Sequence, residues 1–237
     1  MNKKTMNKIK KIAPIALLLT SISSAAFADN WNVGASASYG NIDGTARDTQ
    51  VTGAGAVVAQ TRGATSGDAD FPFGSIFVEY AKTMDKDLDL IIGLDYIPFK
   101  AEIDSKSFSD TSLEAAATGT GSRTAKLELS NYATLYLQPT FKIGGGTAVY
   151  GKVGYIHGDV KISGSNAATS STINATDTLN GYTVGLGVQH NLNKNLFVRL
   201  EGNYTDHDNV KATDSKGTTF SAESEMYAGK LSIGYSF

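Results

Sequence analysis

Few side chains in this sequence could act as bases, nucleophiles or metal ligands. There are three histidines and no cysteine, which excludes a lipid-modified N-terminal cysteine, disulfides and thiolate metal sites. His207 stands between Asp206 and Asp208, which on paper could orient it as a base or join it at a metal. A solvated polar loop explains this triplet more simply. His157 and His190 have no acid and nucleophile at useful spacing, so we expect no catalytic residue, no metal site and no cofactor.

Other chemical signals also favour a non-enzymatic chain. Gly144, Gly145 and Gly146 do not form a phosphate loop, because neither a helix nor a Lys-Ser/Thr pair follows, and we expect a tight turn there. Lipid A deacylases and palmitoyltransferases need a placed Ser/His pair, but the sequence has no His-x-Ser at a suitable position.

The first 28 residues have the three parts of a secretory signal peptide. Five lysines precede the apolar run 12–19, and the small-residue site 26–28 follows it. Pro14 interrupts the apolar run, which is much shorter than the roughly 20 residues that a membrane-spanning helix needs. The sequence therefore predicts a signal peptide over residues 1–28 and one mature domain over residues 29–237.

The charge of the predicted mature chain argues against nucleic acid as a partner. The signal segment holds five of the 21 basic residues and no acid, so its removal leaves 16 basic and 23 acidic residues, a net charge of −7. A nucleic-acid-binding domain needs a basic stripe that neutralises phosphates, and this sequence has none.

The mature chain alternates apolar and polar residues in short runs, which is typical of β-strands with one apolar face. In the clearest run, Val198 and Leu200 share one face while Arg199 and Glu201 share the other. This periodicity fits either a transmembrane barrel or a soluble barrel such as a lipocalin. Eight segments repeat the pattern: 31–40, 73–83, 88–100, 125–142, 147–158, 180–191, 196–205 and 225–237.

The lengths of the connections favour the transmembrane barrel. Short and long connections alternate strictly, so all short turns lie at one end of the barrel and all long loops at the other. Outer-membrane barrels have this asymmetry, with short periplasmic turns and long extracellular loops. The short connections are 84–87, 143–146 and 192–195, and the long ones are 41–72, 101–124, 159–179 and 206–224.

Aromatic residues on the predicted lipid face fall into two groups by height, as expected where amphipathic rings sit at the two membrane interfaces. The long-loop belt comprises Tyr39, Tyr96, Tyr155, Tyr182, Tyr204 and Tyr227, and the short-turn belt comprises Trp31, Tyr80, Phe141, Tyr235 and Phe237. We therefore predict an all-β, eight-stranded antiparallel transmembrane barrel, which pairs every backbone group by closing on itself.

The opposite face of the strands carries charges of both signs. The interior of an eight-stranded barrel is just wide enough for side chains to fill, so these charges should pair and form a plug rather than a pore. Pro98 and Pro139 interrupt strand runs and are expected at rim or bulge positions. The predicted interior polar residues are Glu79, Asp95, Lys126, Glu128, Lys152, Arg199, Glu201 and Lys230.

The last strand, which ends in Tyr235 and Phe237, resembles the C-terminal targeting segment of bacterial outer-membrane proteins. This resemblance implies insertion by the barrel-assembly machinery. Together with the stretches 150–155 and 197–204, the eight strands are similar to the small outer-membrane β-barrel family, which includes the OmpA barrel domain, OmpX, Ail and opacity-type surface proteins. The resemblance implies a cell outer-membrane location, contact with lipid and lipopolysaccharide, and roles such as adhesion, resistance to host defence or envelope integrity.

Our main functional expectation is a non-enzymatic surface protein whose long loops bind an unidentified partner on a host, a phage or a neighbouring cell. A narrow small-solute porin is the first alternative, although the predicted charged plug conflicts with it. A lipid A-modifying enzyme is the second.

Overall fold

The structure, a computed structural model, describes residues 30–52, 58–61, 65–111, 120–166, 171–213, 215 and 219–237. The predicted signal peptide lies outside the described residues. The described part consists of strands and turns, and no helix in it is long and apolar enough to cross a membrane. The strands are β1 (Asn30–Thr52), β2 (Val58–Thr61), β3 (Thr65–Asp85), β4 (Leu88–Ile97), β5 (Ala101–Thr111), β6 (Thr120–Gly144), β7 (Thr147–Asn166), β8 (Ser171–Asn191), β9 (Leu196–Thr213) and β10 (Thr219–Ser236).

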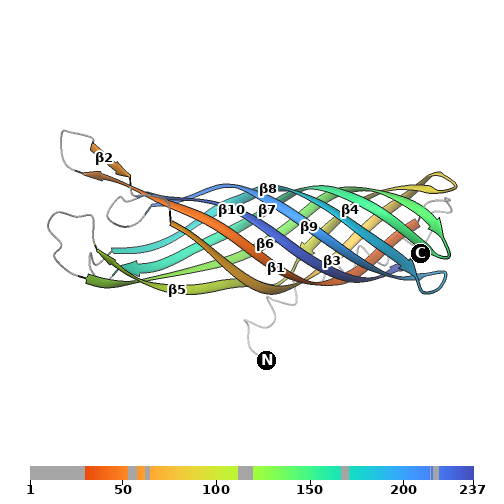
Figure 1. The fold of residues 1–237 in the computed structure, drawn as a ribbon, viewed down its shortest axis with the longest axis horizontal. Coiled ribbons are helices and arrows are strands. Elements are labelled where there is room, and N and C mark those ends of the chain that lie inside the picture. Colours follow the sequence, from red (N-terminus) through yellow and green to blue (C-terminus); the bar gives the residue numbers. More distant parts are fainter. Residues whose placement is uncertain are drawn as a thin grey trace, which may run out of the picture.

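Eight of these strands form a closed antiparallel ring in the order β1, β3, β4, β6, β7, β8, β9 and β10 (Figure 1). The pairing of β10 with β1 closes the ring from Asn32↔Ser236 to Thr49↔Thr219. The other two strands are additions to it, since β5 follows β4 along β6, and β2 forms a hairpin with the end of β1. The predicted eight-stranded barrel is confirmed.

The three predicted short turns lie together at the end of the barrel that holds the C-terminus (Figure 1). The turn between β6 and β7 contains the three glycines, with φ angles of 96°, 60° and 74°. Only glycine adopts such angles without steric cost, which explains why this turn is so tight.

The predicted boundaries of the long connections are wrong, because the strands continue far into them. β7 runs to Asn166 and β9 to Thr213, and strands β6 to β8 have 20 to 25 residues where about 9–11 suffice to cross a membrane. At a rise of about 3.3 Å per residue and a tilt of about 40°, 20 residues make a wall about 50 Å high.

The two prolines act differently. Pro98 follows the last residue of β4, so the third strand ends at Ile97 and not at residue 100 as predicted. Pro139 lies inside β6 opposite Leu90, and the β6–β7 pairing lapses beside it without a change of register. A proline has no N–H to give to a neighbouring strand, which accounts for both interruptions.

A β-bulge in β6 changes which residues face the interior. The register with β7 shifts between Ser130 and Ala133, and Asn131 within the bulge has a φ of 54°. Asparagine tolerates this left-handed conformation better than most residues. Below the bulge Tyr136 is buried and Leu135 is exposed, whereas above it the odd-numbered Leu129 is buried.

Candidate functional site

The middle of the barrel holds a buried charge pair between strands that are far apart in the sequence. Glu79 on β3 is 1% exposed and Arg199 on β9 is 3% exposed. Arg199 Nη1 donates to Glu79 Oε1 at 2.5 Å and Nη2 donates to Oε2 at 2.8 Å. Tyr136 and Asn32 donate to the same carboxylate, and Gln189 accepts from Arg199 Nε at 2.8 Å. Each charge is therefore paired and hydrogen-bonded, which a buried ion requires.

Two further pairs complete this ionic network. Lys152 Nζ lies 2.5 Å from Glu201 Oε2, and Lys230 Nζ donates to Asp95 Oδ2 at 2.8 Å. Lys152 Nζ also lies 4.4 Å from the centroid of the Tyr136 ring, a cation–π contact. With three acids and three bases in direct pairs, the network balances its own charge, and each of its side chains is at most 13% exposed.

An apolar cluster fills the barrel on the long-loop side of the ionic network. Its buried members are Phe71, Leu129, Tyr132, Ile156, Val160, Leu179, Val210 and Met226. His207 lies beside it and is 5% exposed, with Nε2 3.1 Å from Tyr132 Oη and Nδ1 3.2 Å from Ser224 Oγ. The interpretation of residues 206–208 as a solvated polar loop is therefore wrong for His207, which is an interior residue of β9.

The outward face of the wall reverses its polarity with height. At the level of the ionic network the outward residues are apolar, as for Leu200, which is 64% exposed between the buried Arg199 and Glu201. Towards the long-loop end the exposed residues of β7 and β9 are polar or charged, as at Lys161 and Asp206, and the inward ones are apolar, as at Val160 and Val210. One continuous sheet thus suits an apolar surrounding below and water above.

Residues predicted for the aromatic belts pair on neighbouring strands. In the long-loop belt, the ring centroids of Tyr155 and Tyr182 are 5.4 Å apart and those of Tyr204 and Tyr227 are 5.1 Å apart. In the short-turn belt, the ring centroids of Trp31 on β1 and Tyr80 on β3 are 5.3 Å apart. Tyr235 and Phe237, two residues apart at the C-terminus, have ring centroids 5.1 Å apart. Tyr39 and Phe141 are exposed on the same outer face. The polarity reversal coincides with the long-loop belt.

Six of the eight predicted interior polar residues make the ionic network, but Lys126 and Glu128 do not. Glu128 lies on the outer face, opposite the exposed Lys161, and pairs there with Lys100. Lys126 is two residues before Glu128 on β6, so it belongs to the same face of the strand. The reason is the Asn131 bulge, which inserts an unpaired residue and moves every position above it to the other face.

The other two histidines have neutral partners. His157 Nδ1 lies 2.9 Å from Asn180 Oδ1, and His190 Nδ1 lies 3.0 Å from Thr147 Oγ1. Within the described residues, no group of three or more histidine or acidic side chains could hold a metal ion.

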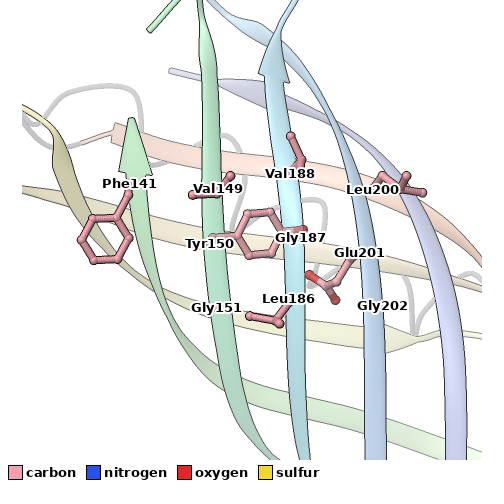
Figure 2. Close-up of a pocket in the computed structure, with 10 residues that line it drawn as sticks. All are labelled: Phe141, Val149, Tyr150, Gly151, Leu186, Gly187, Val188, Leu200, Glu201 and Gly202. Carbon is pink, nitrogen blue, oxygen red and sulfur yellow. The ribbon is translucent and has the colours of Figure 1, made fainter. Parts of the chain in front are cut away.

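The outer face also has an apolar hollow of about 680 Å³ across β7, β8 and β9 (Figure 2). Its floor is low because Gly151 and Gly202 have no side chain, and Leu186 lies between them in register. Phe141, Val149, Val188 and Leu200 border it. The hollow lies within the outward apolar band, and Tyr150 and Glu201, which belong to the interior, also line it.

Sequence reasoning missed the interior apolar cluster. The signal was present, because alternation continues past the long-loop belt at residues such as Ile156 and Val160 on β7. The apolar residues there simply occupy the inward phase, where the lower part of the strand has Lys152.

Comparisons with known proteins agree with this architecture. Residues 15–223 match the model of the family described as outer membrane protein beta-barrel domain. A 22 kDa outer membrane protein of Rhizobium leguminosarum bv. viciae is 37% identical over 89 residues, which are 38% of this chain and only 39% of that relative.

Two solved structures share the fold at low sequence identity. OprG of Pseudomonas aeruginosa is 17% identical, with a TM-score of 0.52 over 88% of this chain and 95% of its own. The outer membrane protease OmpT of Escherichia coli is 12% identical, with a TM-score of 0.50 over 91% of this chain and 99% of its own. Since one of these neighbours is a protease, fold alone does not separate enzymes from non-enzymes. The family match covers most of the sequence, and the chain belongs to the outer membrane protein β-barrel domain family and resides in the cell outer membrane.

Proposed function

We propose that this protein is a non-enzymatic surface protein that binds partners outside the cell with the part of its wall beyond the long-loop belt. We call this part the extension: residues 40–52, 65–75, 101–111, 120–132, 156–166, 171–181, 205–213 and 219–226. Adhesion, host or phage interaction and envelope integrity all fall within this proposal.

The observation that carries the proposal is the reversal of polarity along continuous strands. An apolar band about 25 Å tall suffices for a membrane, yet the wall is about twice that height. The additional height presents charged side chains such as Asp206, Asp208, Glu223 and Glu225 on paired strands rather than on free loops. A surface that is already ordered loses little entropy when it binds, which favours specific recognition.

Contacts with the envelope form part of the same proposal. The outward apolar band and its two aromatic belts suit lipid and the acyl chains of lipopolysaccharide. The last strand, with Tyr235 and Phe237 exposed at its end, suits recognition by the barrel-assembly machinery during insertion.

The test compares three strains and one control strain in binding assays against cultured host cells, phage and neighbouring bacteria. One carries the parent protein, one lacks it, and one carries Asp206→Asn, Asp208→Asn, Glu223→Gln and Glu225→Gln together. We expect the strain without the protein to lose binding to at least one target, and the four-residue variant to lose several-fold of that binding. Asp85→Asn with Asp87→Asn, at the opposite end of the barrel, is the matched control and should bind normally. Unchanged binding to every target by the strain without the protein would overturn the proposal.

A further inference from the structure

The barrel wall is not closed along its whole height. The β3–β4 pairing ends at Ile76↔Tyr96, and β4 itself ends one residue later. Above this level, β3 pairs only with β1, and β5 pairs only with β6, among the strands that the structure describes. Over residues 65–75 of β3 and 101–111 of β5, the described ladders therefore use one edge of each strand, and the two remaining edges begin where β4 ends. We call these two edges the β3–β5 seam.

Proline explains why the wall opens here. Pro98 separates β4 from β5 and cannot continue the backbone pairing with β3. Pro72, on the opposite edge of the seam, also lacks an N–H, and proline within a sheet is expected on edge strands.

The seam lies in the extension, within reach of water. It begins beside Tyr96 and opposite Tyr39, both in the long-loop belt, and runs away from the membrane. Phe99, between β4 and β5, is 73% exposed and lies with Phe73 and Ile97 at a small hollow at the base of the seam. The exposed Phe99 ring therefore gives the base an apolar surface that a partner's side chain can cover, and the rest of the seam offers backbone N–H and C=O groups.

Both edges are acidic in sequence. The β3 edge has Asp68 and Asp70, and the β5 edge has Glu102, Asp104 and Asp110 against the single base Lys106. Like charges on both edges disfavour pairing between two copies of this chain, since each would bring its acids against those of the other. They favour an incoming strand that is basic.

We propose that the β3–β5 seam binds an extended basic segment of a partner protein by strand addition. The backbone of the segment pairs with the open edges, its basic side chains face the acids, and an apolar residue covers Phe73 and Phe99. This inference rests on the proposed function and names the kind of partner that the extension takes.

The first test uses the purified full barrel in detergent micelles with labelled peptides of about eight residues, the usual length of a strand partner. One peptide alternates Lys with Val and Thr, the second is the same peptide N-methylated at alternate residues, and the third has Glu in place of Lys. We expect the basic peptide to bind and to slow amide hydrogen exchange in both 65–75 and 101–111. The N-methylated peptide should bind at least about tenfold more weakly, because it cannot donate the backbone hydrogen bonds that strand addition requires.

Equal binding of the N-methylated peptide would mean charge attraction alone and would overturn strand addition. Exchange that stays fast in both segments would overturn it as well. A dimer of the barrel that the basic peptide dissociates would assign the seam to a second copy instead, and light scattering distinguishes this outcome.

Variants at the seam provide the matched control. Asp68→Asn with Asp70→Asn should weaken the basic peptide several-fold, and Asp85→Asn with Asp87→Asn should not. The amide that Asp70→Asn introduces keeps an oxygen that can accept the hydrogen bond from Asn41, so this substitution preserves the β1–β3 contact. If the peptide does not bind but the strain lacking the protein loses cell binding, the seam inference fails and the proposed function stands. If the peptide binds but no cell binding depends on the protein, the proposed function fails.

Discussion

The pair of Glu79 and Arg199 shows how single residues hold the interior together. Both side chains are almost completely buried, and the two hydrogen bonds between them join strands that are neighbours only across the lumen. The carboxylate also accepts from Tyr136 and Asn32, so its removal disturbs several partners at once. A buried ion without its partner is far more costly than a buried pair.

Glu79→Ala should therefore destabilise the barrel by about 3–5 kcal/mol, because it leaves the Arg199 guanidinium buried and unpaired. Urea unfolding in micelles, followed by the fluorescence of the single tryptophan, measures this loss. Glu79→Leu with Arg199→Met should be more stable than Glu79→Ala, since no unpaired charge remains. Asp89→Ala, which breaks the exposed pair with Lys142, should cost less than about 1 kcal/mol. Similar losses at both sites would contradict the role given to the network.

Among the strands, β6 shows how one element can reverse which of its residues face the interior. Its bulge at Asn131 lets the strand keep apolar residues outward near Leu135 and inward at Leu129. Asn131 Nδ2 also donates to Asp159 Oδ2 on β7 at 2.6 Å, which ties the bulge to the neighbouring strand. Without the bulge, the apolar residues above it would face water and Glu128 would face the lumen.

Asn131→Val should destabilise the barrel by about 1–2 kcal/mol, because a β-branched residue fits poorly at a positive φ. Asn131→Gly, which accepts that conformation but loses the bond to Asp159, should cost less than Asn131→Val. The same urea titration compares the two variants. Equal stability of the valine and glycine variants would contradict the idea that the positive φ requires asparagine at this position.

At the scale of the whole molecule, the outer face of the barrel suits lipid at one level and water at another, and side chains pack its interior. The ionic network occupies the lumen at the level of the apolar band, and the apolar cluster fills the space above it. Water and ions would have to separate the Glu79–Arg199 and Lys152–Glu201 pairs in order to pass.

Purified protein in planar bilayers should therefore give no steady unitary conductance. On a gel, its unheated and heated forms should migrate differently, as expected of a stable barrel. Steady openings of uniform size would contradict the sealed lumen and favour the small-solute porin. A detergent extract from cells lacking the gene is the control, because traces of other porins also conduct.

Much of the interior could be predicted from the sequence, but its upper limit could not. The interior positions of Glu79, Asp95, Lys152, Arg199, Glu201 and Lys230 follow from strand phase alone, since successive side chains point to opposite faces. The strand phase gives the wrong face for Lys126 and Glu128, because the extra residue of the Asn131 bulge reverses which positions of β6 point inward. The prediction for His207 was wrong for another reason, because the predicted strand ended at residue 205, whereas β9 continues to Thr213 and keeps His207 in the inward phase of Arg199 and Glu201.

By itself, the sequence determined the strands, the glycine turn and the two faces, because a period of two residues and a positive φ are local properties of the chain. Only the tertiary structure decided where the wall ends, which charges meet and where β3 and β5 part. Glu79 and Arg199 are 120 residues apart, and they meet only because the registers of all the intervening strands add up around a closed ring. This combined register depends on every bulge and proline between the two residues, so it cannot be read from a local sequence pattern.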